Sequence, residues 1–228
     1  MLLYRVFGQA TPYVLPFLLF IVLMAVSGML IDNSELAKRF DVRWLYAARI
    51  VLVGAAVLYF WPSYSELRRP YRIQSSQLLG SIALGVVVFL FWIQLDIKWL
   101  SIGESNGFVP LAADGSLSWA HVIPRLIGAA VLVPVIEELF WRSFLMRWLE
   151  NPEFLAVQPA RIKLKVLLIS SVIFALEHNL WFAGLLAGLA YGWLYIRTGN
   201  LWYPIIAHAT TNGILGLWVI YTGNWQFW

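Results

Sequence analysis

Two adjacent carboxylates stand inside an apolar run near the middle of the chain. They are Glu137 and Glu138, and Arg142 follows four residues after the second of them. Ionisable side chains are costly in hydrocarbon, so within an apolar segment they usually face a polar interior and mark function. On a helix, Glu138 and Arg142 are neighbours that can form an ion pair, whereas Glu137 points about 100° away from Glu138. The spacing therefore leaves Glu137 free for chemistry.

Two later apolar segments carry histidines. His178 ends the segment Phe174-Ala-Leu-Glu-His, in which Glu177 is typical of a residue at the edge of a loop. His208 and Asn212 are four residues apart, so on a helix both side chains lie on one face. Polar groups at this depth should converge, because each of them alone is expensive in lipid. We expect them to meet Glu137 around one water-holding pocket.

Such a pocket predicts hydrolysis of a peptide bond within the membrane. Glu137 could act as general base on a water molecule, helped by His178. His208 and Asn212 could donate hydrogen bonds to the oxyanion that forms when water attacks a carbonyl, and donors of this kind are worth ~3–4 kcal/mol in a dry site. The reaction class is then amide hydrolysis.

Two alternatives to this chemistry stay open. The chain has no cysteine, no HExxH zinc helix and no GxSxG elbow, and no aspartate falls within a predicted span. We expect no cofactor, although Glu137, His178 and His208 could hold a zinc ion, since two His and one Glu form zinc sites. The same residues could also serve as the relay of a proton-coupled transporter or of a non-proteolytic membrane partner. The sequence shows no inverted repeat of the kind that transporters use.

Each polar feature also has an ordinary structural explanation when it is taken alone. Glu138 with Arg142 would be an ion pair along a helix, and His178 would be an interfacial residue at a helix end. His208 with Asn212 would form hydrogen bonds between helices. The combination of all of them in one small apolar chain favours a site.

The composition indicates a polytopic helical membrane protein. Of the 228 residues, 61% are hydrophobic and 12% are charged, and the mean hydropathy is +0.75. A soluble domain carries about 25% charged residues, roughly twice this share. The net charge of +4 fits basic loops beside an anionic leaflet better than a nucleic-acid surface. The expected partners are therefore the lipid bilayer and a membrane-associated peptide or protein substrate, and no nucleic acid.

We predict an all-α, polytopic transmembrane helical bundle of about seven spans, within a range of six to eight. One span needs about 20 apolar residues. The candidate spans are residues 13–31, 44–61, 77–95, 119–149, 166–177, 180–196 and 201–221. The fourth is long and contains Pro124 and Pro134, which predicts a kink or a short entering piece before the helix that carries the glutamates.

Two sets of residues within these spans lead to expectations about packing. Arg49 and Arg125 stand near span ends, and we expect both side chains to extend to the membrane surface. Gly184, Gly188 and Gly192 recur every four residues in the sixth span, which predicts the close approach of a neighbouring helix.

Taken in order, three motifs resemble those of the CPBP family, the intramembrane CAAX proteases and bacteriocin-processing enzymes. The motifs are Glu137-Glu138-x-x-x-Arg142, Phe174-x-x-x-His178 and His208-x-x-x-Asn212, and all three are complete within residues 133–212. The resemblance implies a glutamic-type mechanism. In it, the first glutamate and the first histidine activate water, and the second histidine and the asparagine form the oxyanion site. The resemblance also implies that Glu138, Arg142 and Phe174 support the site.

The resemblance bears on organisation, metal and location as well. It divides the chain into N-terminal transmembrane helices without a recognised motif, residues 1–118, and a CPBP-like catalytic helical core, residues 119–228. Some members of the family have been described as metalloproteases, so the question of a metal carries over. Residues 171–213 and the aromatic end also resemble a narrower bacterial branch, the CAAX-protease-related proteins associated with exosortase and PEP-CTERM protein sorting. That likeness implies the bacterial cytoplasmic (inner) membrane and a possible exosortase/PEP-CTERM partner.

Overall fold

A computed structural model describes residues 2–31, 40–69, 74–103 and 107–228, and within them the fold is all-α. Apart from one isolated bridge between Leu111 and Leu117, these residues form no β-structure. The helices are α1 (Leu2–Ile31), α3 (Trp44–Phe60), α4 (Ser65–Arg68), α5 (Ser75–Gln94), α6 (Trp119–Ile127), α7 (Val133–Glu138), α8 (Arg147–Glu150), α9 (Leu164–Leu176), α10 (Trp181–Thr198) and α11 (Trp202–Thr222). The predicted fold class is confirmed.

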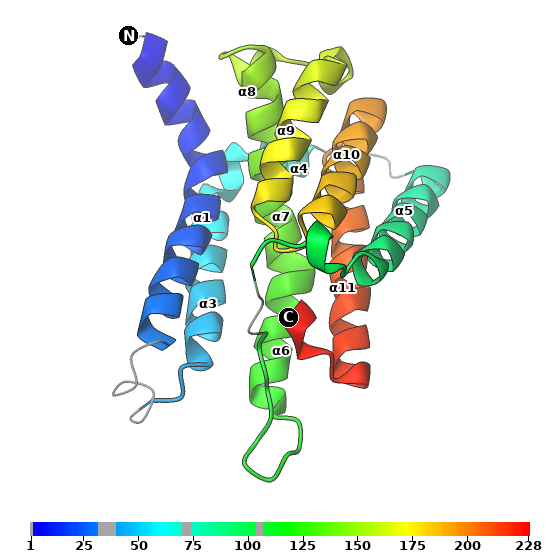
Figure 1. The fold of residues 1–228 in the computed structure, drawn as a ribbon. Coiled ribbons are helices and arrows are strands. Elements are labelled where there is room, and N and C mark those ends of the chain that lie inside the picture. The colour runs from blue at the N-terminus through cyan, green and yellow to red at the C-terminus, as the bar shows by residue number, and fades with distance from the viewer. Residues whose placement is uncertain (1, 32–39, 70–73, 104–106) are drawn as a thin grey trace.

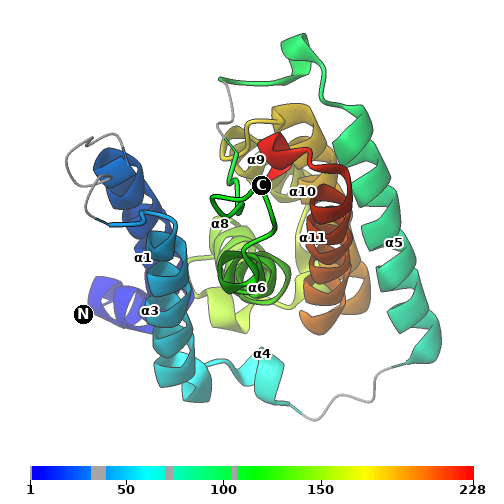
Figure 2. The ribbon, with the colours of Figure 1, turned by 90° about the horizontal axis from the view of Figure 1, so that it is seen from below.

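The helices surround one long central helix made of α6, α7 and α8. The pair α1 and α3 lies on one side of it, and α9, α10 and α11 lie on the other, with α5 outermost against α11 (Figures 1 and 2). The outward faces carry large apolar side chains, for example Leu18, Val51, Leu79, Leu164 and Leu217. A soluble protein would bury such faces, whereas a membrane covers them.

Among the described residues, five helices are long and apolar enough to cross a membrane by length and composition. They are Gly8–Ile31, Trp44–Ser63, Ser75–Gln94, Trp119–Glu150 and Trp202–Thr222. The predicted fifth and sixth spans form α9 and α10, so all seven predicted segments are helical and the expected number of spans is approximate.

The central helix runs without a break over Trp119–Glu150. It does not divide into a short entering piece and a long helix, which was one of the two outcomes expected from its prolines. Instead, π-helical turns occupy Gly128–Leu132 and Leu139–Met146, and Pro134 is the second residue of the α-helical segment between them. Such turns inside α-helices occur frequently at functional sites. Here one lies before and one after the segment α7, which carries the two glutamates.

The hairpin of α9 and α10 has a short first arm. With 13 residues, α9 is about 20 Å long, which is less than the ~30 Å hydrocarbon core. The turn that follows α9 therefore lies about half-way along the bundle rather than at its end (Figure 1). A β-carbon added at Gly188 of α10 would come within 3.0 Å of Ser171 Cα on α9, so the predicted close packing of the glycine face is confirmed.

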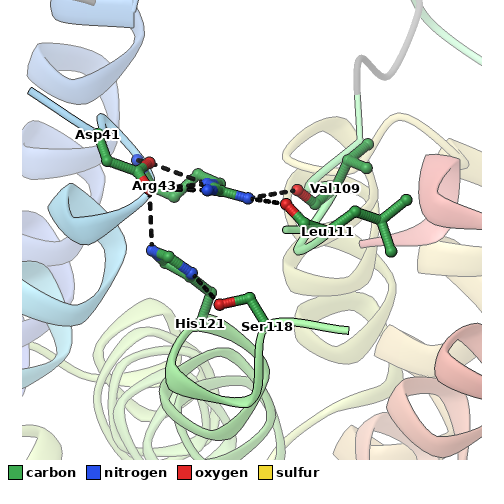
Figure 3. A network of polar contacts seen from close by, with 6 residues as sticks. All are labelled: Asp41, Arg43, Val109, Leu111, Ser118 and His121. Atoms are coloured by element: carbon green, nitrogen blue, oxygen red, sulfur yellow. Dashed lines mark hydrogen bonds and ion pairs between the residues drawn. The ribbon is translucent and has the colours of Figure 1, made fainter. Parts of the chain in front are cut away.

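A polar network ties the loop before α6 to the start of α3 (Figure 3). Arg43 donates to Asp41 through Nε at 2.8 Å and to the Leu111 carbonyl through Nη1 at 2.6 Å. His121 Nε2 lies 3.3 Å from Asp41 Oδ2, and its Nδ1 is hydrogen-bonded to Ser118 Oγ at 2.8 Å. The hydrogen bonds from Arg43 lower the pKa of the Asp41 carboxyl below its usual 3.8, an effect that burial opposes.

Candidate active site

One cavity of about 230 Å³ lies between the central helix and its neighbours, and all four residues predicted to be catalytic line it, together with Phe174. Glu137 comes from α7, and His178 from the turn after α9. His208 and Asn212 come from α11. The structure thus brings together the four side chains that the sequence analysis expected to meet. The short arm α9 makes this possible, because it delivers His178 to the middle of the bundle.

Glu137 is the carboxylate that remains available. Its side chain is 7% exposed, and its Oε2 has no hydrogen-bond partner among the described residues. A buried carboxylate without partners is costly, and it persists where function requires it. Glu137 also lines the cavity, where its carboxylate can accept a hydrogen bond from a water molecule.

Glu138 differs from Glu137 in that one of its oxygens, Oε1, is paired, although its Oε2 is also buried without a hydrogen-bond partner among the described residues. It is fully buried, and its Oε1 lies 3.0 Å from Arg142 Nη1 and 2.9 Å from His208 Nδ1. The predicted ion pair between Glu138 and Arg142 is confirmed. Because an ionised carboxylate only accepts hydrogen bonds, the Nδ1 of His208 is the donor. Glu138 thereby fixes the orientation of the imidazole and leaves Nε2 as the free nitrogen.

Arg142 is held on several sides. It is 2% exposed, its Nη2 lies 3.5 Å from the Gly188 carbonyl, and its Cζ lies 4.6 Å from the centroid of the Phe174 ring. These contacts connect α10 and α9 to the central helix. Arg142 and Glu138 do not line the cavity, so their position fits support rather than contact with substrate.

His178 has one nitrogen committed and one free. Its Nδ1 donates to the Phe174 carbonyl at 2.9 Å, because a carbonyl can only accept. In the neutral ring Nε2 is then unprotonated, and this is the form that can accept a proton. The Trp92 ring packs edge-on against the His178 ring with 5.4 Å between centroids.

Phe174 holds the two histidines in place from its position on α9. Its ring centroid lies 4.6 Å from that of His178 and 6.5 Å from that of His208. The Trp141 ring packs edge-on against it at 5.5 Å. Phe174 therefore packs between the two imidazoles and the central helix.

The side-chain amide of Asn212 donates one hydrogen bond to the central helix. Its Nδ2 donates to the Ala129 carbonyl at 2.9 Å, and Ala129 belongs to the first π-helical turn. Backbone groups displaced by such turns need partners within the protein when they lie in a membrane. Since an amide nitrogen has two hydrogens, one donor of Asn212 remains for the cavity.

The sequence analysis missed Tyr191. Its ring stacks on His208 with 5.0 Å between centroids and 21° between planes, and its hydroxyl is hydrogen-bonded to Thr211 Oγ1 at 2.7 Å. Tyr191 stands three residues after Gly188, so it shares the glycine face of α10. A tyrosine hydroxyl on the glycine face of α10 was the sequence signal that could have identified Tyr191 as a site residue. Glu177 lies exposed in the turn after α9, as expected of a residue at a loop edge.

Two arginines were expected at the membrane surface, and the structure corrects this. Arg49 is 7% exposed and lines the cavity, and Arg125 is half-buried and lines it too. The rotation of each helix turns these side chains inward. The N-terminal helices therefore contribute to the cavity even though they carry no recognised motif.

Within the described ranges, no group of three or more His, Cys, Asp or Glu side chains is arranged to hold a metal ion. Glu137, His178 and His208 do not fit the three-ligand zinc site considered from the sequence, and we derive no step through a metal.

Comparison with known proteins gives one match. Residues 119–214 match the family model described as type II CAAX prenyl endopeptidase Rce1-like. The matched stretch runs from the start of α6 into α11 and includes Glu137, His178, His208 and Asn212. Searches of curated proteins and of solved structures gave no match.

Proposed function

Over residues 119–214 the chain belongs to the Rce1-like family of type II CAAX prenyl endopeptidases, and on that premise we propose how it cleaves its substrate. The protein is a multi-pass integral membrane protease. We assign it a glutamic-type mechanism, in which side chains alone activate the water. The observation that carries this assignment is that Glu137, whose Oε2 has no hydrogen-bond partner among the described residues, lines the same cavity as His178, His208 and Asn212.

The reaction starts with water between Glu137 and His178. Glu137 takes a proton from the water, with His178 Nε2 as the second acceptor. The water oxygen forms a bond to the carbonyl carbon of the substrate, and the carbonyl π electrons move onto its oxygen. The proton taken from water then passes to the amide nitrogen as the carbon–nitrogen bond breaks, so a new carboxyl terminus and a new amine leave the site.

The oxyanion formed in the first step needs donors. Asn212 supplies the hydrogen of Nδ2 that Ala129 does not use. His208 donates from Nε2 only as an imidazolium, because its Nδ1 hydrogen points to Glu138. Removing one such donor costs about 10²- to 10³-fold in kcat in other hydrolases.

The substrate is proposed to be a membrane-associated peptide or protein. We propose the bacterial cytoplasmic membrane as the location and an exosortase/PEP-CTERM sorting system as a candidate partner. These proposals rest on the likeness of residues 171–213 to the exosortase-associated branch.

Comparative membrane proteomics tests the function. A deletion strain and a Glu137→Gln strain should accumulate the same uncleaved precursor, and the wild-type gene should remove it. Glu153→Gln, which changes an exposed carboxylate, is the matched control and should behave as wild type. Full processing in the Glu137→Gln strain would refute the mechanism. A pH-gradient-dependent flux in liposomes without any peptide product would instead favour the proton-coupled transporter.

A further inference from the structure

The two inward-facing arginines are the part of the cavity that the proposed chemistry does not use. Arg49 lies on α3 with its Cζ 4.7 Å from the Phe20 ring centroid and 4.8 Å from that of Tyr46. Arg125 lies on α6 with its Cζ 4.4 Å from the same Tyr46 ring. Two guanidiniums from two helices thus share one aromatic ring at the wall of the cavity.

Neither arginine has an acidic partner among the described residues. No carboxylate forms an ion pair with Arg49 or Arg125 there, and the Nε of each is buried without a hydrogen bond. The other two buried arginines differ, since Arg142 pairs with Glu138 and Arg147 pairs with Glu66. An uncompensated charge in an apolar interior is expensive. Two such charges side by side indicate a site that an anion completes.

The arginines lie on the same helix face as the proposed base. Arg125, Ala129, Val133 and Glu137 follow one another at intervals of four residues, and all of them line the cavity. Twelve residues of helix separate Arg125 from Glu137, which is ~18 Å between Cα atoms. An anion at the arginines is thus remote from the reacting atoms, but it lies in the same cavity.

We infer that Arg49 and Arg125 bind the C-terminal carboxylate of the substrate peptide and thereby position the peptide bond to be cleaved. A guanidinium pair suits a carboxylate, which can accept two parallel hydrogen bonds. The peptide ends at its C-terminal carboxylate, so this group can occupy an interior site. The carboxylate of an internal acidic residue could do so only if the peptide chain on both sides of it also passed through the interior. The inference rests on the proposed function, because it names a recognition element of that same site. Both arginines are positioning residues.

Binding to an inactive protein tests this without requiring turnover. The probe is the apolar peptide acetyl-Leu-Val-Ile-Ala, prepared with a free carboxylate and as its amide. Purified Glu137→Gln protein in phosphatidylcholine nanodiscs should bind the acid at least 10-fold more tightly than the amide. Adding Arg49→Gln or Arg125→Gln should reduce that ratio to below about twofold, the size expected when a charge-assisted hydrogen bond is lost. Arg161→Gln changes an exposed arginine and should keep the full ratio.

Several results would overturn the inference. Equal binding of acid and amide, or no binding of either, would do so. So would a preference for the acid that survives both arginine substitutions. If nanodiscs with phosphatidylglycerol stabilise the protein through Arg49 while acid and amide still bind equally, the anion is a lipid phosphate and the inference is wrong. A thermal unfolding curve for each variant separates lost binding from lost folding.

The proposed function can fail separately. If the wild-type protein never cleaves a peptide although acid-dependent binding needs both arginines, then the proteolytic mechanism is wrong and the carboxylate site stands. If the protein cleaves acid and amide substrates equally well, the proteolytic mechanism stands and the carboxylate site is wrong.

Discussion

Two buried polar clusters lie along the same central helix, and they differ in how completely their atoms are paired. The structural cluster consists of Glu66, Ser143, Arg147 and Tyr195. Glu66 accepts from Arg147 at 2.6 Å, from Tyr195 at 2.6 Å and from Ser143, and Arg147 also donates to the Phe154 carbonyl at 2.8 Å. The second cluster, called the catalytic cluster after the role proposed for it, consists of Glu137, His178, His208 and Asn212.

The catalytic cluster leaves polar atoms free where the structural cluster does not. Glu137 Oε2 has no partner among the described residues, and the free nitrogens of the two histidines follow from their single hydrogen bonds. Buried polar atoms in folded proteins are nearly always satisfied, so an unsatisfied one needs an explanation. Both clusters place an acid near basic or imidazole side chains. The unpaired atoms beside a cavity distinguish the second cluster from the structural one.

The largest expected effect is the loss of cleavage in Glu137→Gln. Removal of the general base should lower kcat by about 10²- to 10⁴-fold. The free energy of unfolding should stay the same or rise, because an unpaired buried carboxylate is removed. Turnover of a reconstituted substrate and unfolding in detergent measure the two effects. A Glu137→Gln variant that is strongly destabilised but still active would show that Glu137 contributes to stability rather than to cleavage, and the two clusters would then not differ in role.

Glu66→Gln should have the converse effect. Breaking the buried pair with Arg147 leaves an uncompensated charge and should lower the free energy of unfolding by about 3 kcal/mol. The variant that remains folded should keep its kcat, because Glu66 does not line the cavity. Unfolding in detergent, compared with Glu153→Gln, measures the change. Unaltered stability would show that the pairing at Glu66 is not structural.

Glu138→Gln should fall between these two. It removes the charge that pairs with Arg142 and orients His208, while an amide oxygen remains to accept a hydrogen bond. Loss of such a supporting partner typically costs 10- to 100-fold in activity in metal sites, and we expect about the same drop in kcat here. Stability should fall as well. The KM for substrate should change little, and a change confined to KM would contradict the assigned role.

The smallest expected effect concerns the network at Asp41. Its carboxyl has a lowered pKa in the folded protein, so it stays ionised to a lower pH than in the unfolded chain. The stabilisation is therefore complete above about pH 4 and is lost as the pH falls through the folded pKa. Thermal unfolding between about pH 3 and pH 6 should show this loss in the wild type and not in Asp41→Asn. An identical pH profile for both proteins would contradict it, and activity at neutral pH should not differ.

Local spacing in the sequence was sufficient wherever one helix decides the outcome. The all-α fold, the ion pair between Glu138 and Arg142 and the short α9 each depend on residues within a few turns of one another. The glycine face of α10 was predictable for the same reason, since four-residue spacing alone aligns it. The catalytic roles of Glu137, His178, His208 and Asn212 stay predictions, although the structure brings all four to one cavity.

Tertiary structure decided what depends on the rotation of each helix about its axis. In an apolar helix every face could meet either lipid or protein, and packing against the neighbours sets which face turns inward. That is why Arg49 and Arg125 line the cavity instead of reaching the surface, and why Tyr191 stacks on His208. The sequence by itself determined which chemistry was available and at what depth, whereas the packing of the helices determined which side chains share the cavity.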